Sequence, residues 1–398
     1  MRKSLLGSLV LLCLLFSSSC LFAQDLGSVV DANNQFAFEL YSQYKSKDGN
    51  VFFSPYSISS ALAMTYEGAR GETANQIQAV FHFPRDNSVL RESFLKIYDQ
   101  INKKDKKYQL HTANALWAQK GYPFLEDYFK LVEKYYGGKV TNLDFIKETE
   151  KSRLTINEWV EEQTNDKIKD LIPRRSIDEF TLLVLTNAIY FKGFWLKQFD
   201  KKDTKEEDFV VSPGNVVKVD MMHLTDKGAE FNYAETDKLQ ILELPYEGEE
   251  LSMLILLPKE NSLESIESSL NAEKLSTLKS LLREREIDIY IPKFKFETKY
   301  FMKEDLCRMG MPTAFSGDAD FSGMTGKRDL FISQVIHQAF VDVNEKGTEA
   351  AAATAVIMKL GVSKIKTFKA DHPFIFVIQQ RETGNILFLG RVVNPTAT

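Results

Sequence analysis

The chain has 398 residues, of which 44% are hydrophobic and 26% are charged, and its formal net charge is -5. This composition is ordinary for a soluble globular protein, and the acidic balance disfavours a nucleic-acid-binding protein, which would carry a basic face. Neither a Pro-, Gly- or Ser-rich linker nor an internal repeat divides the chain. We therefore expect one large domain beyond the first 23 residues.

The N-terminal 23 residues have the pattern of a secretory signal peptide. Two basic residues precede an apolar run, Leu5–Phe16, which is too short to span a membrane. Cleavage after Ala23 would release residues 24–398 as a secreted or periplasmic protein. The alternative is a lipoprotein signal with Cys20 as the lipid-bearing residue. Such a site usually has an aliphatic residue three positions earlier, where this chain has Ser17.

The expected cleavage determines how many cysteines the mature chain contains. Only Cys307 remains in the mature chain, which can therefore form no internal disulfide. A large apolar core must supply the stability. Cys307 lies in "EDLCRMGM", where an amphipathic helix would bury it, so we interpret it as an inert core thiol rather than a nucleophile.

The first elements are expected to be helices. Residues 31–44 repeat apolar side chains at helical spacing, and three of them share one face: Phe36, Leu40 and Tyr44. Residues 55–68 follow Ser54 and begin with a proline and end with a glycine, which are typical helix boundaries. Residues 181–195 form a long apolar run that predicts a buried strand.

Strands dominate the second half. Residues 239–246 and 251–259 are apolar segments around the turn "EGEE" and predict a hairpin. Residues 286–300 alternate with a period of about two, with these apolar positions: Ile287, Ile289, Ile291, Phe294 and Phe296. Residues 372–393 predict a second hairpin that turns at 382–385. Helices followed by strands indicate an α+β fold with antiparallel sheets.

No catalytic or cofactor motif emerges from the chain. No two of the five histidines have metal-ligand spacing: His82, His111, His223, His337 and His372. The nucleophile elbow G-x-S-x-G is absent, and "GMTGKRD" lacks the spacing of a phosphate loop. The basic run "KKDKK" at 103–107 is better interpreted as a solvated turn than as a polyanion site. We expect neither an enzyme nor a cofactor- or metal-binding protein.

Residues 343–360, "VNEKGTEAAAATAVIMKL", are unusual. Alanine has the lowest helix cost of any residue, yet no apolar stripe at helical spacing runs through the segment. Thr354, Val356 and Ile357 are β-branched and favour strands. The segment therefore has the pattern of neither a stable helix nor an ordinary loop.

This segment resembles the hinge of the reactive-centre loop of serpins. Further segments that resemble serpin signatures occur in family order across almost the whole mature chain: "NVFFSPYSISSALAMTYEGARGETANQI" from Asn50, "LTNAIYFKGFW" from Leu185, "HQAFVDVNEKGTEAAAAT" from His337, "ADHPFIFVI" from Ala370 and "FLGRVVNP" from Phe388. The resemblance implies a fold of three β-sheets and about nine helices, with an exposed C-terminal reactive-centre loop at about 345–368.

The resemblance also implies an activity. A target endopeptidase cleaves the loop, and the loop then inserts as a new strand into the central sheet, carrying the acylated protease with it. The implied protein is a protease inhibitor that binds its target covalently, uses no cofactor, and is a monomer capable of loop-sheet polymerisation. A non-inhibitory serpin that binds a hormone, partner or chaperone client is the alternative, although such members tend to carry bulky, charged or proline residues at the hinge.

The alternation of side chains suits insertion as a strand, in which every second residue points inward. One face would contain Thr348, Ala350, Ala352, Thr354, Val356 and Met358. The other face would contain Glu349, Ala351, Ala353, Ala355, Ile357 and Lys359. Both charges fall on the second, outward face, and no proline interrupts the ladder.

The resemblance assigns roles to individual residues. The hinge would comprise Glu345, Gly347, Thr348, Glu349, Ala350, Ala351, Ala352 and Ala353. The shutter, where the sheet parts, would comprise Ser54, Ser57, Asn187 and His337. Trp195 would lie at the breach, where insertion begins.

The reactive bond has three candidates. In this family the residue before the bond usually lies fourteen positions after the hinge glycine, which indicates Gly361-Val362. A bond after Leu360 would suit chymotrypsin-, elastase- or subtilisin-like serine proteases. With the bond after Gly361, Leu360 lies second from the bond, a position that papain-like cysteine proteases read. A bond after Lys359 would suit trypsin-like enzymes and ranks below the other two.

Overall fold

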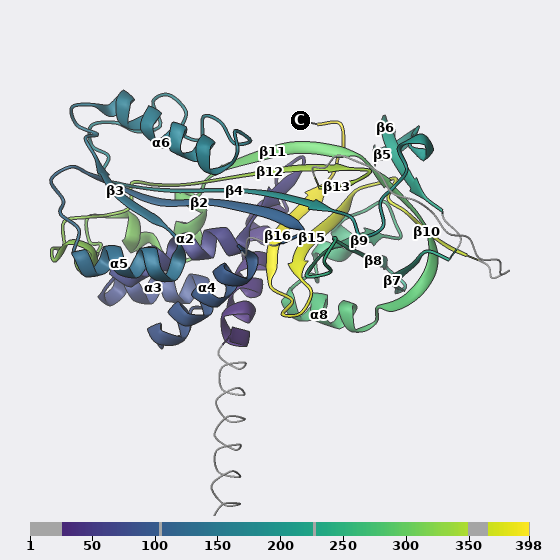
Figure 1. Ribbon diagram of the computed structural model, residues 1–398, viewed down its shortest axis with the longest axis horizontal. Helices are drawn as coiled ribbons and strands as arrows, with labels where there is room; N and C mark the ends of the chain where they lie inside the picture. The colour runs from purple at the N-terminus through teal and green to yellow at the C-terminus, as the bar shows by residue number, and fades with distance from the viewer. Residues whose placement is uncertain (1–25, 103–105, 226–227, 349–364, 398) are drawn as a thin grey trace, which may run out of the picture.

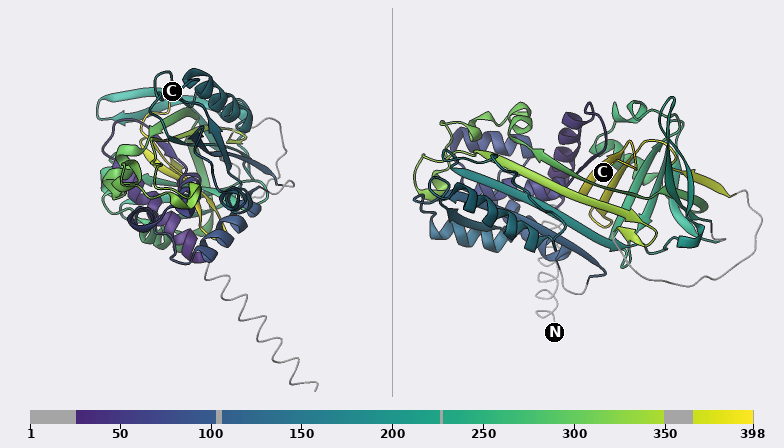
Figure 2. Two further views of the ribbon diagram at one scale, coloured as in Figure 1. Left: turned by 90° about the vertical axis from the view of Figure 1, so that its left-hand side faces the viewer. Right: turned by 90° about the horizontal axis from the view of Figure 1, so that it is seen from above.

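The computed structural model describes residues 26–102, 106–225, 228–348 and 365–397. The expected signal peptide and residues 349–364 lie outside this part of the chain. Within it, a long six-stranded sheet has helices on both faces, and a second set of strands continues at one end (Figures 1 and 2). Among the described residues, no helix has both the length and the apolar character needed to cross a membrane.

The six-stranded sheet has the order β11-β12-β13-β4-β2-β3. Its strands are β11 (Phe294–Phe301), β12 (Gln334–Asn344), β13 (Gly347–Thr348), β4 (Leu183–Phe194), β2 (Tyr108–Gln119) and β3 (Lys139–Leu143). In Figure 1 it runs across the upper middle of the molecule, with α6 above it and α2 and α5 below.

The remaining strands form one ten-stranded hydrogen-bonded network. They are β1 (Val51–Phe53), β16 (Ile386–Val392), β15 (Phe374–Gln380), β9 (Leu251–Pro258), β8 (Leu239–Pro245), β7 (Glu230–Glu235), β10 (Arg283–Pro292), β6 (Asn215–Leu224), β5 (Lys205–Ser212) and β14 (Lys366–Lys369). The first four residues of β10 pair with β7, and its later residues pair with β6 and β14. The network divides at β10 into two sheets, which gives three sheets in all.

Ten α-helices lie in the described part of the chain. They are residues 26–44, α2 (Pro55–Gly68), α3 (Gly71–Phe81), α4 (Asn87–Ile101), α5 (Glu126–Tyr136), α6 (Thr149–Gln163), α7 (Glu264–Glu267), α8 (Ala272–Ser280), α9 (Lys303–Met309) and α10 (Ser322–Thr325). Two of them have only four residues. The α+β class and its three sheets are confirmed, and the helix count is close to the nine expected.

The predicted helices and hairpins are present. The apolar face of the first helix is fully buried at Phe36, Leu40 and Tyr44. Ser54 caps α2, and its side chain accepts a hydrogen bond from the backbone N–H of Ser57. Strands β8 and β9 form the first predicted hairpin, and β15 and β16 form the second.

Two strand predictions need correction. Residues 286–300 form parts of two strands in different sheets: the residues up to Pro292 belong to β10, which pairs with β6 and β7, and those from Phe294 belong to β11, which pairs with β12. The sheets are also mixed, since β2–β3, β4–β12 and β10–β14 are parallel pairs among the described strands. Parallel neighbours need long connections, and the hydrophobic pattern does not reveal them.

The expected loop limits of 345–368 overlap with regular structure at both ends. Gly347–Thr348 form β13, and Lys366–Lys369 form β14, which pairs with β10. Cys307 lies on α9, as expected, but it is only partly buried, and burial raises the pKa of its thiol.

Two apolar clusters position the six-stranded sheet. The larger cluster includes α2 and the strands of the ten-stranded network. The smaller lies on the opposite face, where Ile156 and Val160 of α6 and the segment after it pack on Ala113, Val184 and Ala188. Both faces of the sheet are therefore covered, and its strands are buried on both sides.

Candidate functional site

The site lies where β4 and β12 meet, which we call the seam. Residues 334–340 of β12 pair directly with residues 184–190 of β4, in parallel. Beyond that point the two strands diverge, and β13 lies between them, antiparallel to both. The right-hand view of Figure 2 shows the long β4 and β12 side by side. The seam is closed along most of its length and opened at one end.

Gly347 allows this close approach. It pairs with Asn344 on β12 and Phe194 on β4. Its φ is +153°, and a Cβ added there would lie 2.0 Å from Gly193 O. Any other residue would collide with the backbone of β4, so the first step of β13 into the seam requires glycine.

Thr348 is the last described residue of the hinge, and it points inward. Its side chain is 1% exposed, and its Oγ1 lies 2.9 Å from the hydroxyl oxygen of Tyr246. This is the face on which the alternation of the sequence places it. Burial raises the pKa of Tyr246, so the phenol stays neutral.

Trp195 holds the open end of the seam. Its indole Nε1 donates to Asn344 O at 3.0 Å, and its backbone N–H donates to Lys346 O at 2.8 Å. The ring stacks on Tyr246, with centroids 4.7 Å apart. Trp195 thus fixes the turn between β12 and β13 from one side.

Glu345 fixes the same turn from the other side. Its Oε1 accepts hydrogen bonds from Thr204 Oγ1 at 2.9 Å and from Lys293 Nζ at 3.2 Å. Burial by itself would raise the pKa of this carboxyl, but hydrogen bonds from its own backbone, from Thr204 and from Lys293 lower it. The backbone N–H of Phe199 donates to Glu345 O at 2.8 Å.

The four predicted shutter residues meet at the closed part of the seam, on the face that α2 covers. His337 of β12 and Asn187 of β4 are directly paired, and His337 Nδ1 contacts Asn187 Oδ1. The backbone N–H of Ser54 donates to His337 Nε2 at 3.1 Å, and Asn187 Nδ2 donates to Ser57 O at 2.9 Å. Asn114 of β2 completes the cluster by accepting from Asn187 Nδ2.

This network determines the tautomer of His337. Because Nε2 accepts from Ser54, the proton of the neutral ring resides on Nδ1 and is donated to Asn187. Burial lowers the pKa of His337 to about 3, and a hydrogen bond with Asn187 opposes that shift only in part. The imidazole is therefore neutral at physiological pH.

Comparison with known proteins gives the family. The family model for serpins, described as serine protease inhibitors, matches residues 31–395. The chain belongs to the serpin family.

Individual relatives agree with this assignment. An uncharacterised serpin-like protein of Methanosarcina acetivorans is 48% identical over 92% of this chain and 88% of its own. The leukocyte elastase inhibitor of Equus caballus is 44% identical over 92% of this chain and 98% of its own. The crystal structure of human thyroxine-binding globulin with thyroxine has a TM-score of 0.86 and 32% identity, covering 94% and 100% of the two chains.

Sequence reasoning missed several residues of the serpin site. Asn114, Tyr246, Thr204 and Lys293 come from strands or turns distant in the sequence from the residues they contact. A lone asparagine in the otherwise apolar "ANALWA" of β2 was the one available signal, because buried polar groups require partners. The predicted residues Glu349, Ala350–Ala353 and Leu360–Val362 lie outside the described residues.

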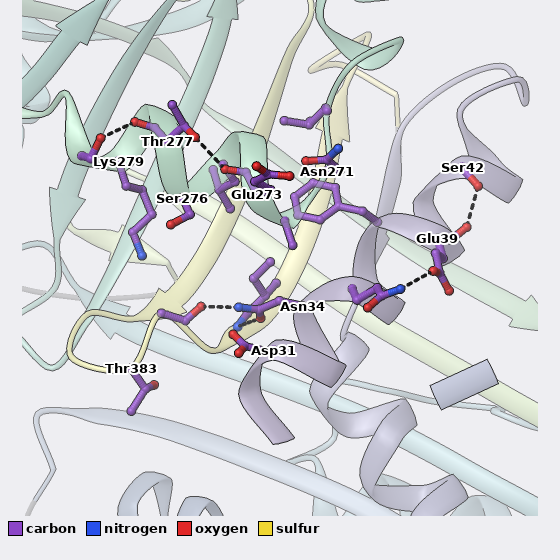
Figure 3. A pocket seen from close by; sticks show the side chains of 18 residues that line it. Asp31, Asn34, Glu39, Ser42, Asn271, Glu273, Ser276, Thr277, Lys279 and Thr383 are labelled. Carbon is purple, nitrogen blue, oxygen red and sulfur yellow. Dashed lines mark hydrogen bonds between the residues drawn. The ribbon is translucent and has the colours of Figure 1, made fainter. Parts of the chain in front are cut away.

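A separate groove of about 1020 Å³ lies between the first helix, α8 and the turn from β15 to β16 (Figure 3). Its lining is mixed, with polar and apolar surface in nearly equal amounts, and its polar residues include Asp31, Asn34, Glu39, Asn271, Thr277, Lys279 and Thr383. Burial lowers the pKa of Lys279, whose Nζ donates to Gln379 Oε1 at 2.8 Å. No group of side chains with metal-ligand geometry occurs among the residues that the structure describes.

The neutral buried His337 predicts a pH dependence of stability. In the unfolded chain the imidazole has an ordinary pKa of about 6.5, so between that value and about 3 the unfolded state binds a proton that the folded state excludes. The free energy of unfolding should fall as pH falls through this window, by up to about 1.4 kcal/mol per pH unit. His337→Gln should lose this component, as measured by denaturant unfolding at pH 7.5 and 5. An identical pH dependence in the variant would contradict the assignment.

Proposed function

We propose that this serpin is an irreversible, suicide-substrate inhibitor of serine-type endopeptidases of the elastase, chymotrypsin or subtilisin kind. The protease attacks one bond of the reactive-centre loop. Its serine oxygen forms an ester with the carbonyl carbon of the residue before the bond, and the amine of the next residue leaves with the proton. The loop then inserts into the seam before water can hydrolyse the ester.

The observation that carries the proposal is β13. This two-residue strand already lies between β12 and β4, antiparallel to both, and it points along the seam. Extending its register after cleavage would place Met358 opposite Ser333 and Leu183, where β12 and β4 begin. The segment from Thr348 to Met358 is therefore long enough to fill the seam completely.

Insertion must separate residues that are now paired. The contact between His337 and Asn187 crosses the seam, and a strand between β12 and β4 would break it. The partners of Asn187 on α2 and β2 would remain in place. Breaking the His337–Asn187 contact therefore adds to the energy barrier for insertion.

The target class rests on the residues near the bond. Leu360 offers an aliphatic side chain to the primary pocket of an elastase- or chymotrypsin-like enzyme, and a relative of 44% identity is named leukocyte elastase inhibitor. If the bond follows Gly361, Leu360 would instead occupy the second position before the bond, which papain-like cysteine proteases recognise. A bond after Lys359 would shorten the inserted strand. In each of these cases the protease supplies the catalytic groups. This chain supplies the bond that is cleaved and the sheet into which the loop inserts.

The groove of Figure 3 supports a second candidate, a non-inhibitory serpin that binds a small molecule. Its volume of about 1020 Å³ suits a drug-sized ligand, and the similar thyroxine-binding globulin was solved with thyroxine. The small residues of the hinge favour inhibition over binding alone.

The compartment is part of the proposal. The basic start and the apolar run Leu5–Phe16 support export and cleavage after Ala23, to a secreted or periplasmic location. Lipid attachment at Cys20 is the alternative. We propose that the exported protein acts as a monomer.

Replacing Thr348 with Arg should convert the inhibitor into a substrate. The site is 1% exposed and faces Tyr246, so the guanidinium would be buried without a partner as the strand enters. Denaturing gels after incubation with subtilisin or elastase should show cleaved serpin and almost no covalent complex. Glu349→Arg is the matched control, because position 349 falls on the outward face and should retain inhibition. Full inhibition by Thr348→Arg would refute insertion.

Cleavage of the loop should raise the melting temperature of the wild-type protein well above that of the intact form. Insertion completes the six-stranded sheet and releases stored strain. The comparison needs only scanning calorimetry of intact and protease-nicked protein. Equal melting temperatures would favour the binding-protein candidate, because such a serpin has no need to insert its loop.

Two substitutions locate the reactive bond. Leu360→Ala should slow inhibition by about one to two orders of magnitude, because the lost aliphatic group contributes roughly 1.5–3 kcal/mol in a desolvated pocket. Gly361→Arg should create a trypsin inhibitor if residue 361 precedes the bond. Mass spectrometry of the released C-terminal peptide reads the bond directly. If trypsin cleaves Gly361→Arg without forming a denaturant-stable complex, the protease holds Leu360 instead.

A further inference from the structure

The turn 370–373, which we call the corner, joins β14 to β15 and is held by backbone hydrogen bonds on two sides. The backbone N–H of Ala370 donates to Tyr290 O of β10 at 2.9 Å, and that of Val210 of β5 donates to Asp371 O at 2.8 Å. β14 is the first described element after the candidate reactive bonds. The corner therefore holds the C-terminal end of this strand in place.

His372 of the corner has two hydrogen-bond partners, and both are acceptors. Its Nδ1 lies 2.9 Å from Asp371 Oδ1, and its Nε2 lies 2.7 Å from the backbone oxygen of Pro258, where β9 ends. A neutral imidazole has one N–H and can satisfy only one acceptor, whereas the imidazolium ion has two. Only the charged ring satisfies both contacts, and the side chain is 15% exposed, so water has little access to replace a lost N–H.

The surroundings of the ring favour its charged form. Burial by itself would lower the pKa of His372, but the hydrogen bonds to Asp371 and Pro258 and the negative charge of Asp371 raise it. The unfolded imidazole has a pKa of about 6.5, so above that value the folded corner keeps a proton that the unfolded chain has lost. The stabilisation is complete below about pH 6.5 and is lost as the pH rises through the raised pKa of the folded state.

Other charged groups near β14 have partners of their own. Glu207 of β5 lies 2.6 Å from His223 Nε2 of β6 and 2.8 Å from Lys369 Nζ of β14. Lys259, at the end of β9, contacts Glu235 at 3.7 Å. The charge that acts on the ring of the corner is therefore the neighbouring aspartate, and His223 is the second titratable group that a test must separate from it.

We propose that His372 is a proton-dependent latch on the corner. The charged ring ties Asp371 to the end of β9, and loss of its proton leaves one of the two acceptors without a donor. The corner and the end of β14 then open more often, while the rest of the sheet stays folded. The effect is opposite in sign to that of His337, whose contribution is lost as the pH falls, so the two histidines act in separate pH ranges.

Amide hydrogen exchange in the intact protein, followed by NMR, tests the latch. The protection factors of Ala370 and Val210, corrected for the intrinsic exchange rate at each pH, should fall about threefold to tenfold from about pH 6 to about pH 9. His372→Gln offers one donor group and no charge, so it should give the lower protection at both pH values. His372→Lys stays charged over this range and should give the higher protection at both.

Three further variants separate His372 from other titratable groups. His223→Gln should leave the fall in protection unchanged, and so should His82→Gln, which removes a histidine that contacts Glu39 of the first helix. Asp371→Asn should shift the midpoint of the fall to lower pH, because the ring loses its negative partner.

The proposal fails if the protection of Ala370 and Val210 in the wild type stays constant over this range, if His223→Gln abolishes the change, or if His372→Gln keeps the wild-type pH dependence. Should neither variant of His372 fold, titration of the ring by NMR in the wild type decides. A midpoint above about 6.5 supports the latch, and a midpoint at or below that value overturns it. Each of these outcomes is independent of whether the protein inhibits a protease.

Discussion

The direct pairing of β12 with β4 is the contact on which the other features of this serpin depend, and its two faces are held differently. Toward α2, His337 and Asn187 join across the seam and are satisfied by Ser54, Ser57 and Asn114. Toward α6, the packing is apolar. A buried network is costly to break because each freed group loses a partner in a low-dielectric interior. The hydrogen bonds on the α2 side therefore oppose the separation of β12 from β4.

Local pattern was enough for the elements that build this seam. Three predictions rest on patterns of only a few residues, and each is confirmed. They are the buried face of the first helix at Phe36, Leu40 and Tyr44, the Ser54 cap and the buried strand β4. The split of 286–300 between two sheets follows from pairing with different distant strands, β6 and β7 before Lys293 and β12 after it, which no local pattern contains. The same holds for the site. Resemblance identified the shutter residues, but Asn114 and Tyr246 join them only through folding.

Serpins illustrate how one fold supports different functions, and this chain contains structural features suited to two of them. The groove beside α8 is remote in the sheet order from the seam, since it involves β15 and β16 rather than β4 and β12. A ligand there would act on the ten-stranded network. The proposed target protease would act through residues beyond Thr348. Because the two features use different strands, occupancy of one does not physically exclude use of the other.

The proposed insertion would require a hinge that is anchored at one end and able to extend at the other, and the hinge residues divide these requirements along the chain. Trp195, Thr204 and Lys293 hold the backbone and the carboxylate of residues 344–346 in place. Gly347 then turns the chain into the seam where a side chain would collide with Gly193 O. In the sequence from Thr348 to Met358, every second residue counted from Thr348 is uncharged. The anchoring contacts therefore end before Thr348, so the insertion proposed above could lengthen β13 while these contacts remain.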